Sequence, residues 1–167
     1  MNPFTIRHYR EQDADRVLEI NRANVPEVGG MDHDKLVAFA ASAAWLPVVE
    51  VEGEVVAFAV FLTEDADYGS PNYRWFSERH QAFYYVDRIA VDADHRGVGI
   101  GQALYHEAIS RAGAGSRPVF CAEVNTIPAN EPSLGFHARF GFTEVARKRP
   151  YDPESEVAML ERPIDAI

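Results

Sequence analysis

The sequence predicts a single α/β domain built on one mixed β-sheet. Segments of strand and helix composition alternate along all 167 residues, in the order β α α β β β α β α β β. Near the middle, a glycine-rich turn from Arg96 to Gly101 joins a strand rich in aromatic and β-branched residues, Phe83 to Val91, to a helix. A chain of this length can bury one proper core, so we expect one domain over residues 1–167.

The composition narrows the range of partners. Hydrophobic residues make up 47% of the chain and charged residues 25%, and no apolar run approaches the length that crosses a bilayer. A net charge of −10 disfavours nucleic-acid binding, which needs a basic surface. The first residues lack the pattern of a secretory signal, and the one cysteine, Cys121, allows no internal disulfide. We therefore expect a cytoplasmic protein with no nucleic-acid or membrane partner.

The first quarter of the chain predicts a strand and two helices. Residues 4–9 alternate between apolar and polar side chains, which is typical of a half-buried strand. Asp13 can cap a helix that runs to about residue 24, and Asp32 can cap a second helix that runs to about residue 43.

A hairpin and an unusual aromatic segment follow. Residues 46–51 and 55–62 have strand composition and flank a tight turn at Gly53. The next segment, Thr63 to His80, is too aromatic for a solvated linker, and a short helix over about residues 72–79 fits its pattern. Two roles stay open for this segment: a flap that covers a sheet edge or the partner in a homodimer, or a wall of an acceptor pocket.

The last third of the chain predicts three strands and a short helix. Residues 119–124 have strand composition, and a helix over about residues 132–140 ends at Gly141, which suits a helix C-cap. Residues 142–149 and 157–162 then close the sheet, joined by a turn that contains proline.

The glycine-rich turn predicts a site for a phosphate group. Gly97, Gly99 and Gly101 stand at alternate positions just before a helix, so backbone N–H groups and the helix N-terminus can approach an anion closely. The residues that follow, Gln102 and Ala103, match neither a P-loop nor the dinucleotide fingerprint. The alternative is a glycine-rich connection that binds nothing.

Two motifs resemble the GNAT N-acetyltransferase superfamily. Arg96-Gly-Val-Gly-Ile-Gly101 resembles its R/Q-x-x-G-x-G/A turn, and the stretch from Asn130 to Phe142 resembles its N-x-x-A/S-x-x-L/F-Y/H-x-x-x-G-F pattern. The resemblance implies the GNAT fold, a mixed and mostly antiparallel sheet of about seven strands with about four helices, splayed between its two central strands. It also implies acetyl-CoA as cosubstrate, no metal, and a primary amine of a small molecule or peptide as acceptor.

The resemblance also assigns a cofactor site. The backbone of Ile89, Ala90 and Val91 would pair with the pantetheine arm, and Asn130 and Ser133 would hydrogen-bond its other side. The pyrophosphate would bind the backbone N–H groups of Arg96, Gly97, Val98, Gly99, Ile100, Gly101, Gln102 and Ala103.

Acetyl transfer needs an acid and a base, and three residues are candidates. An amine attacks a thioester only when it is neutral, so a group must accept its proton, and another can protonate the sulfur. His137 stands where the family usually has a tyrosine acid; alternatively it only hydrogen-bonds the CoA sulfur or the helix backbone. Asp87 is the first candidate base, with a structural pair to an arginine as its alternative. Glu123 is the second, with a solvent-facing carboxylate as its alternative.

The acceptor is harder to read. We assign Asn24, Tyr73, Trp75 and Tyr85 to acceptor binding, because aromatic and polar side chains line small-molecule sites. The basic cluster of residues 147–149 is either a solvated edge or a partner for the 3′-phosphate of CoA. A CoA- or acyl-CoA-binding sensor without catalysis, and a transferase for longer acyl groups, remain alternatives to the acetyltransferase.

Overall fold

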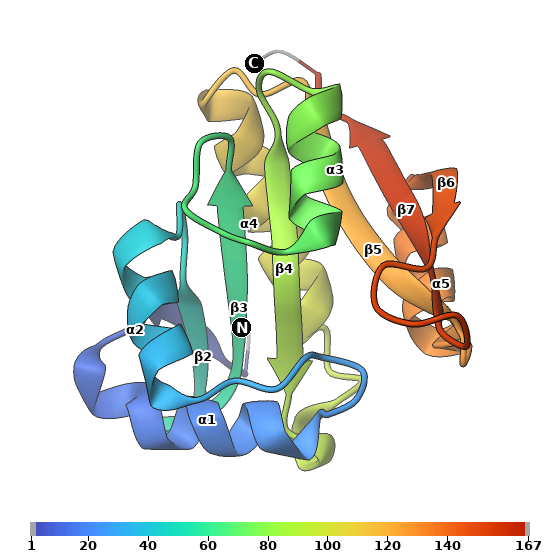
Figure 1. Cartoon of the computed structure of the whole chain (residues 1–167). Coiled ribbons are helices and arrows are strands. Elements are labelled where there is room, and N and C mark those ends of the chain that lie inside the picture. Colours follow the sequence, from blue (N-terminus) through green and yellow to red (C-terminus); the bar gives the residue numbers. More distant parts are fainter. Residues whose placement is uncertain (1–2, 166–167) are drawn as a thin grey trace. The chain divides into compact units, whose positions relative to one another are not determined.

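The structure is a computed structural model that describes residues 3–165 (Figure 1). A seven-stranded sheet has the order β1-β2-β3-β4-β5-β7-β6, which confirms the predicted α/β fold with a mixed sheet. The strands are β1 (Thr5–His8), β2 (Pro47–Val51), β3 (Glu54–Thr63), β4 (Tyr84–Val91), β5 (Val119–Ile127), β6 (Thr143–Lys148) and β7 (Glu156–Pro163). The helices are α1 (Ala14–Ala23), α2 (His33–Ser42), α3 (Pro71–Arg79), α4 (Ile100–Ala114) and α5 (Glu131–Arg139).

The chain divides into two compact units. Unit one holds the chain up to Leu62 together with Val86–Ala108, and unit two holds Thr63–Tyr85 together with the chain from Ile109 onward. Strands β3 and β4 and helix α4 therefore contribute residues to both units. The expectation of a single domain stays a prediction. Within residues 3–165, no helix combines the length and the apolarity that a bilayer crossing requires.

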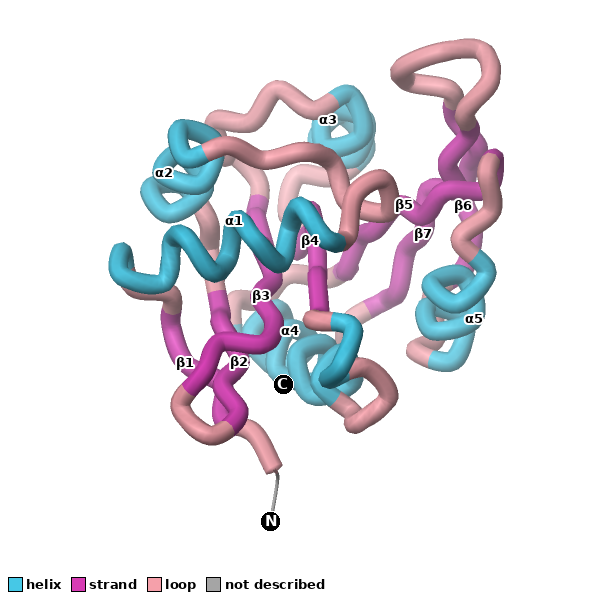
Figure 2. The backbone as a smooth tube through the Cα atoms, turned by 90° about the horizontal axis from the view of Figure 1, so that it is seen from below, coloured by secondary structure: helices cyan, strands magenta, loops and turns pink. Residues whose placement is uncertain are grey.

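Unit one is a three-layered arrangement. Strands β1, β2 and β3 pair antiparallel, and Figure 2 shows α1 and α2 on one side of them and α4 on the other. Glu52 and Gly53 form the β2–β3 turn with φ angles of 51° and 86°, as a two-residue hairpin loop requires. The ring of Phe61 on β3 stacks on Trp45 and meets Tyr105 on α4 edge-on, so β3 lies in the core.

Unit two places α3 and α5 on opposite sides of its strands (Figure 2). Strand β7 pairs antiparallel with both β5 and β6, while β5 pairs in parallel with the start of β4, where Tyr85 lies opposite Cys121. Helix α3 lies where the sequence suggested a short helix, and its buried residues Tyr73 and Phe76 contact the Tyr85 ring at centroid distances of 5.5 and 5.8 Å. The inner face of α3 is thus part of the core. The splay between the two central strands stays a prediction.

One predicted cap differs from the structure. Asp32 caps α2 as expected, since its carboxylate accepts a hydrogen bond from the Lys35 backbone N–H at 2.8 Å. Asp13 makes no such bond at the start of α1. Its buried carboxylate accepts instead from Arg7 at 2.8 and 2.9 Å and from the Arg10 backbone N–H at 2.8 Å. The hydrogen bonds from the Arg7 guanidinium lower the pKa of Asp13, so the carboxylate is charged and pairs with the strand rather than the helix.

Candidate active site

The glycine-rich turn in unit one has the backbone that an anion cradle needs. Gly97 and Gly99 have φ angles of 78° and 91°, a region that favours glycine. A Cβ atom added at Gly97 would meet nothing within 4 Å, so the space over the turn is open. Helix α4 begins directly afterwards, and the Ala103 N–H donates to the Gly99 carbonyl at 3.0 Å. The N–H groups at the start of α4 have no earlier helical turn to bond, so this turn fits a pyrophosphate group.

A side chain from α1's end fixes this turn to β4. The Asn24 amide nitrogen donates to the carbonyls of Ile20 and Val91 at 2.9 and 3.3 Å, and its oxygen accepts from Arg96 at 2.8 Å. Arg96 itself donates to the Val91 carbonyl at 3.3 Å. Asn24, which we assigned to the acceptor, therefore lies among residues assigned to the cofactor. In the same strand Ala90 is buried, while Ile89 and Val91 are half-buried.

A buried arginine connects β4 to the loop between α1 and α2. The Arg88 guanidinium donates to the Asn21 side-chain oxygen at 3.0 Å and to the Gly29 carbonyl at 2.7 Å, and it lies 5.2 Å from the Phe39 ring centroid. Its Nε donates to Asp87 at 2.8 Å, and both side chains are 4% exposed. Asp87 thus forms the arginine pair that was the structural alternative to a base. Arg88 and Asn21 were not identified as site residues from the sequence. An arginine at an inward position of an apolar strand nevertheless indicates a buried polar network.

In unit two, Glu123 lies against a buried tyrosine. The Tyr85 hydroxyl donates to both carboxylate oxygens of Glu123 at 2.8 Å, and Glu123 is half-buried rather than solvent-facing. Tyr73, also assigned to the acceptor, uses its own hydroxyl locally. It donates to the Thr63 carbonyl at 2.6 Å and accepts from the Ala66 N–H at 3.0 Å. The Tyr85 hydroxyl thus connects the Glu123 carboxylate to the aromatic cluster that α3 forms with β4.

Helix α5 brings Asn130, Ser133 and His137 together. The Asn130 side chain caps the helix by accepting from the Ser133 N–H at 3.4 Å. His137 is buried, and its Nδ1 lies 2.7 Å from the Ser133 carbonyl oxygen, which can only accept, so Nδ1 carries the proton. Burial lowers the pKa of His137, so the neutral form is favoured and Nε2 carries no proton. An acid role would require a second proton on this ring, which burial opposes.

His80, Cys121 and Glu161 have potential metal-ligand atoms within 4.8 Å of one another. Glu161 is already engaged, because one of its oxygens accepts from Arg79 at 2.7 Å and lies 2.6 Å from His80 Nε2. Burial raises the pKa of the Cys121 thiol, so the thiolate that metal ligation or nucleophilic attack requires is disfavoured. We therefore interpret this cluster as an Arg79–Glu161 ion pair, with His80 beside it, next to the buried structural thiol of Cys121.

The comparison with known proteins identifies the class. The family model described as "Acetyltransferase (GNAT) family" matches residues 14–142, well over half of the chain. The chain therefore belongs to the GNAT family, which confirms the resemblance of its motifs. It is an acyltransferase that moves the acetyl group of acetyl-CoA to an amine.

Individual relatives agree with this assignment. An N-alpha-acetyltransferase of Sulfurisphaera tokodaii is 29% identical over 164 residues, which cover 94% of this chain and 90% of that protein. The crystal structure of Ard1 from Thermoplasma volcanium is similar with a TM-score of 0.80 at 20% identity, over 97% of this chain and 98% of that one. Arabidopsis thaliana Naa50, solved with the bisubstrate analogue CoA-Ac-MVNAL, has a TM-score of 0.71 at 14% identity, over 96% and 98%. At these identities the two structures establish the fold.

Proposed function

We propose that this acetyltransferase acetylates the α-amine at the N-terminus of a polypeptide. The observation that carries the proposal is the similarity to the N-alpha-acetyltransferase of Sulfurisphaera tokodaii, which extends over 94% of this chain. The cofactor motifs occupy only the stretch from about residue 83 to residue 142. The similarity therefore also spans the segments outside the cofactor motifs, where acceptor specificity would be set.

For the cofactor, we assign the pyrophosphate to the turn from Arg96 to Gly101 with Gln102 and Ala103. The left-handed glycines and the open space above them support this assignment. The backbone of Ile89–Val91 would hold the pantetheine arm, and Asn130 and Ser133 are further candidates to hydrogen-bond it. When bound there, acetyl-CoA supplies the activated acetyl group as a thioester.

For the chemistry, we assign Glu123 as the general base. Its carboxylate accepts a proton from the attacking amine, directly or through one water, as the N–C bond forms and the C–S bond breaks. The Tyr85 hydroxyl holds both carboxylate oxygens, so the base has a fixed orientation. Asp87 would instead influence acceptor binding indirectly, by holding the Arg88 side chain in place. A substrate that reached Asp87 directly would have to displace a buried ion pair.

For His137, we assign a structural role: the ring orients helix α5 and does not protonate the departing thiolate. The Nδ1 proton is donated to the Ser133 carbonyl, which fixes the ring and leaves Nε2 as an acceptor. The departing thiolate then takes its proton from water. The acid role implied by the family motif remains the competing assignment, and it is tested below.

For the acceptor, we assign the loop from Asn24 to Gly30, which Arg88 and Asn21 hold at the Gly29 carbonyl. The net charge of −10 and the single buried cysteine support a cytoplasmic protein without nucleic-acid or membrane partners. The exposed side of α3 next to Trp75 is a second candidate surface. It would either contact the acceptor or form the interface of a homodimer.

A panel of acceptors tests the proposed function. Purified protein is mixed with acetyl-CoA and peptides that have a free N-terminus, and thiol release is followed while mass spectrometry locates the acetyl group. Peptides with a free α-amine should be acetylated, whereas matched peptides with a blocked α-amine and a free lysine should not. Faster transfer to small amines or to lysine would overturn the proposal. CoA binding without transfer to any acceptor would instead support the alternative of a CoA-binding sensor without catalysis.

A further inference from the structure

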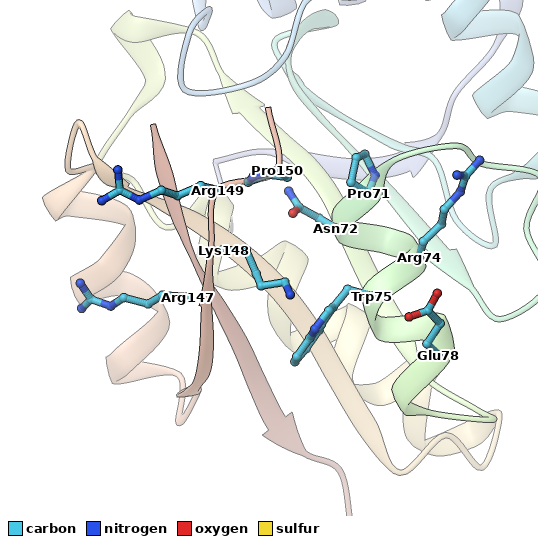
Figure 3. A pocket seen from close by; sticks show the side chains of 9 residues that line it. All are labelled: Pro71, Asn72, Arg74, Trp75, Glu78, Arg147, Lys148, Arg149 and Pro150. Atoms are coloured by element: carbon cyan, nitrogen blue, oxygen red, sulfur yellow. The ribbon is translucent and has the colours of Figure 1, made fainter. Parts of the chain in front are cut away.

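An open pocket in unit two lies outside the residues assigned so far. Its volume is about 540 Å³, and it is bounded by the outer face of α3 and by the end of β6 with the turn that follows (Figure 3). Helix α3 contributes Asn72, Arg74 and Trp75, while Lys148, Arg149 and Pro150 come from the other side. No catalytic role is assigned above to any of these residues, although Trp75 was expected at the acceptor and residues 147–149 were considered as partners for the 3′-phosphate of CoA.

The lining is basic in a chain that is strongly acidic overall. The chain has a net charge of −10, yet the pocket is lined by three arginines and one lysine against a single carboxylate, Glu78. Arg147 and Arg149 are already engaged, because both pair with Glu156, at 3.3 and 3.4 Å. Lys148 forms no ion pair with any residue between 3 and 165, and its Nζ lies 5.8 Å from the Trp75 ring centroid. One uncompensated ammonium group therefore faces this pocket.

A buried amide points into the same space. Asn72 is 3% exposed and lines the pocket, and it is not among the described residues that hold a fully buried polar atom without a partner. In Figure 3 this amide is directed toward Lys148 and Pro150, away from the helix axis. The amide has both donor and acceptor atoms, so it can hydrogen-bond a polar ligand that enters the pocket.

These groups together fit a carboxylate on a short aliphatic stem. The Asn72 amide and the Lys148 ammonium can both donate to carboxylate oxygens, and hydrogen bonds to a charged acceptor are the strong ones. The Trp75 ring and two prolines form apolar walls that suit methylene groups. An aspartate or glutamate side chain has this chemistry.

The same helix links the pocket to the proposed base. While Asn72 and Trp75 face the pocket, Tyr73 and Phe76 on the inner side of α3 contact Tyr85, which holds Glu123. We propose that the pocket binds an acidic side chain of the acceptor polypeptide, downstream of the amine that is acetylated. This inference rests on the proposed function for the identity of the acceptor, and the pocket can be tested separately from acetylation.

Intrinsic fluorescence gives a test that does not depend on transfer. The chain has two tryptophans, and Trp45 is buried in unit one, so a ligand in the pocket should change the emission of Trp75. The probe is an N-acetylated peptide of sequence Gly-Glu-Glu-Gly, which cannot be an acceptor, and the control probe is Gly-Gln-Gln-Gly. We expect saturable binding of the first peptide and at least about tenfold weaker binding of the second, as for a lost charged hydrogen bond.

Variants locate the binding to this pocket. Lys148→Ala and Asn72→Ser should each weaken binding of the glutamate peptide by about tenfold. Arg147→Ala is the matched control: it removes the same charge from the same strand, but its guanidinium is held by Glu144 and Glu156, so binding should not change. Lys148 is exposed, so its variant keeps the inference testable if Asn72→Ser fails to fold.

The remaining outcomes separate this inference from its rivals. Equal affinity for the two peptides, or unchanged binding by Lys148→Ala, would overturn it. Adenosine 3′,5′-bisphosphate serves as a second probe, and a response to it alone would assign the pocket to the CoA phosphate instead. Binding of the glutamate peptide without acetylation of any free peptide would support the pocket and overturn the proposed function.

Discussion

The Tyr85 hydroxyl donates to both oxygens of Glu123 at 2.8 Å, whereas the carboxylate of Asp87 is paired with the Arg88 guanidinium at 2.8 Å. The two carboxylates that the sequence offered as bases therefore have different environments. Glu123 is half-buried, and its carboxylate accepts from a neutral donor. Asp87 belongs to a buried network that holds a loop. This difference leads to the first prediction.

Glu123→Gln should lower kcat by about 10²-fold or more, the usual range for loss of a general base, while CoA affinity stays unchanged. Its residual rate should keep rising with pH, because only acceptor amine that has already lost its proton can react. Tyr85→Phe keeps the carboxylate and should cost less. Thiol release at saturating acetyl-CoA measures these rates.

Asp87→Asn is the matched comparison for Glu123→Gln, since both replace a carboxylate with an amide. It should act mainly on acceptor KM and on stability, through Arg88. A larger loss of kcat in folded Asp87→Asn than in Glu123→Gln would transfer the base assignment to Asp87.

His137 should make folding stability depend on pH. Burial lowers the pKa of His137 in the folded protein, so below about pH 6.5, the usual value for an unfolded chain, the unfolded state binds the extra proton. The free energy of unfolding should therefore fall as the pH drops through about 6.5 toward the lowered folded pKa. His137→Phe should show a smaller loss between neutral and mildly acidic pH in urea titrations. Parallel pH profiles of the two proteins would contradict a buried, neutral histidine.

The same variant separates the two catalytic roles of His137. If the ring only orients α5, His137→Phe should keep kcat within about tenfold of the wild type, below the 10²-fold usual for general acid catalysis. His137→Tyr should then show no advantage over phenylalanine. A fall of about 10²-fold in His137→Phe, with recovery in His137→Tyr, would establish the acid role instead.

Arg88→Lys should disturb acceptor binding. Lysine keeps the charge but cannot donate to Asp87, Asn21 and Gly29 at once, as the planar guanidinium does. Breaking such a buried contact costs up to about 3–5 kcal/mol of stability. We expect a higher acceptor KM, unchanged CoA affinity, and faster hydrogen exchange in the Asn24–Gly30 loop. Normal exchange in that loop would show that Arg88 does not hold it.

Gly99→Glu should abolish the thermal stabilisation that acetyl-CoA gives by mass action. A carboxylate would stand at the pyrophosphate, and the residue would have to keep a φ angle of 91°. Gly53→Glu is the control, because Gly53 has a similar φ of 86° in the β2–β3 turn, away from every proposed ligand contact. Gly53→Glu should lose stability but keep the shift with acetyl-CoA. Equal shifts in both variants would remove the turn from the cofactor site.

Features that depend on neighbouring residues were predicted well from the sequence. The turn at Glu52–Gly53, the Asp32 cap and the end of α5 at Gly141 all depend on side chains or φ angles within a few residues of each other. The same holds for the glycine-rich turn before α4, because its residues are contiguous in the chain.

Contacts between distant segments could not be predicted in this way. Arg88 and Asn21 are 67 residues apart, and Tyr85 and Glu123 are 38 apart, so only the sheet order brings their strands and helices together. Asp13 gives an example. Its residue type and position favour a helix cap, but in the fold its carboxylate pairs with Arg7 on β1 and makes no capping hydrogen bond. The side-chain partners of Asp13, Asp87 and Glu123 therefore follow from the fold and not from the local sequence.

The route of the chain through its two units restricts how this enzyme can be divided. The sequence passes between the units after Leu62, after Tyr85 and after Ala108, and these three crossings fall inside β3, β4 and α4. No single cut therefore yields a fragment that contains one whole unit and nothing of the other. A chimaera that exchanges an entire unit with a related enzyme needs three junctions, all of them within regular secondary structure. The segments proposed to bind the acceptor are thus more readily exchanged as individual loops than as a transplanted half.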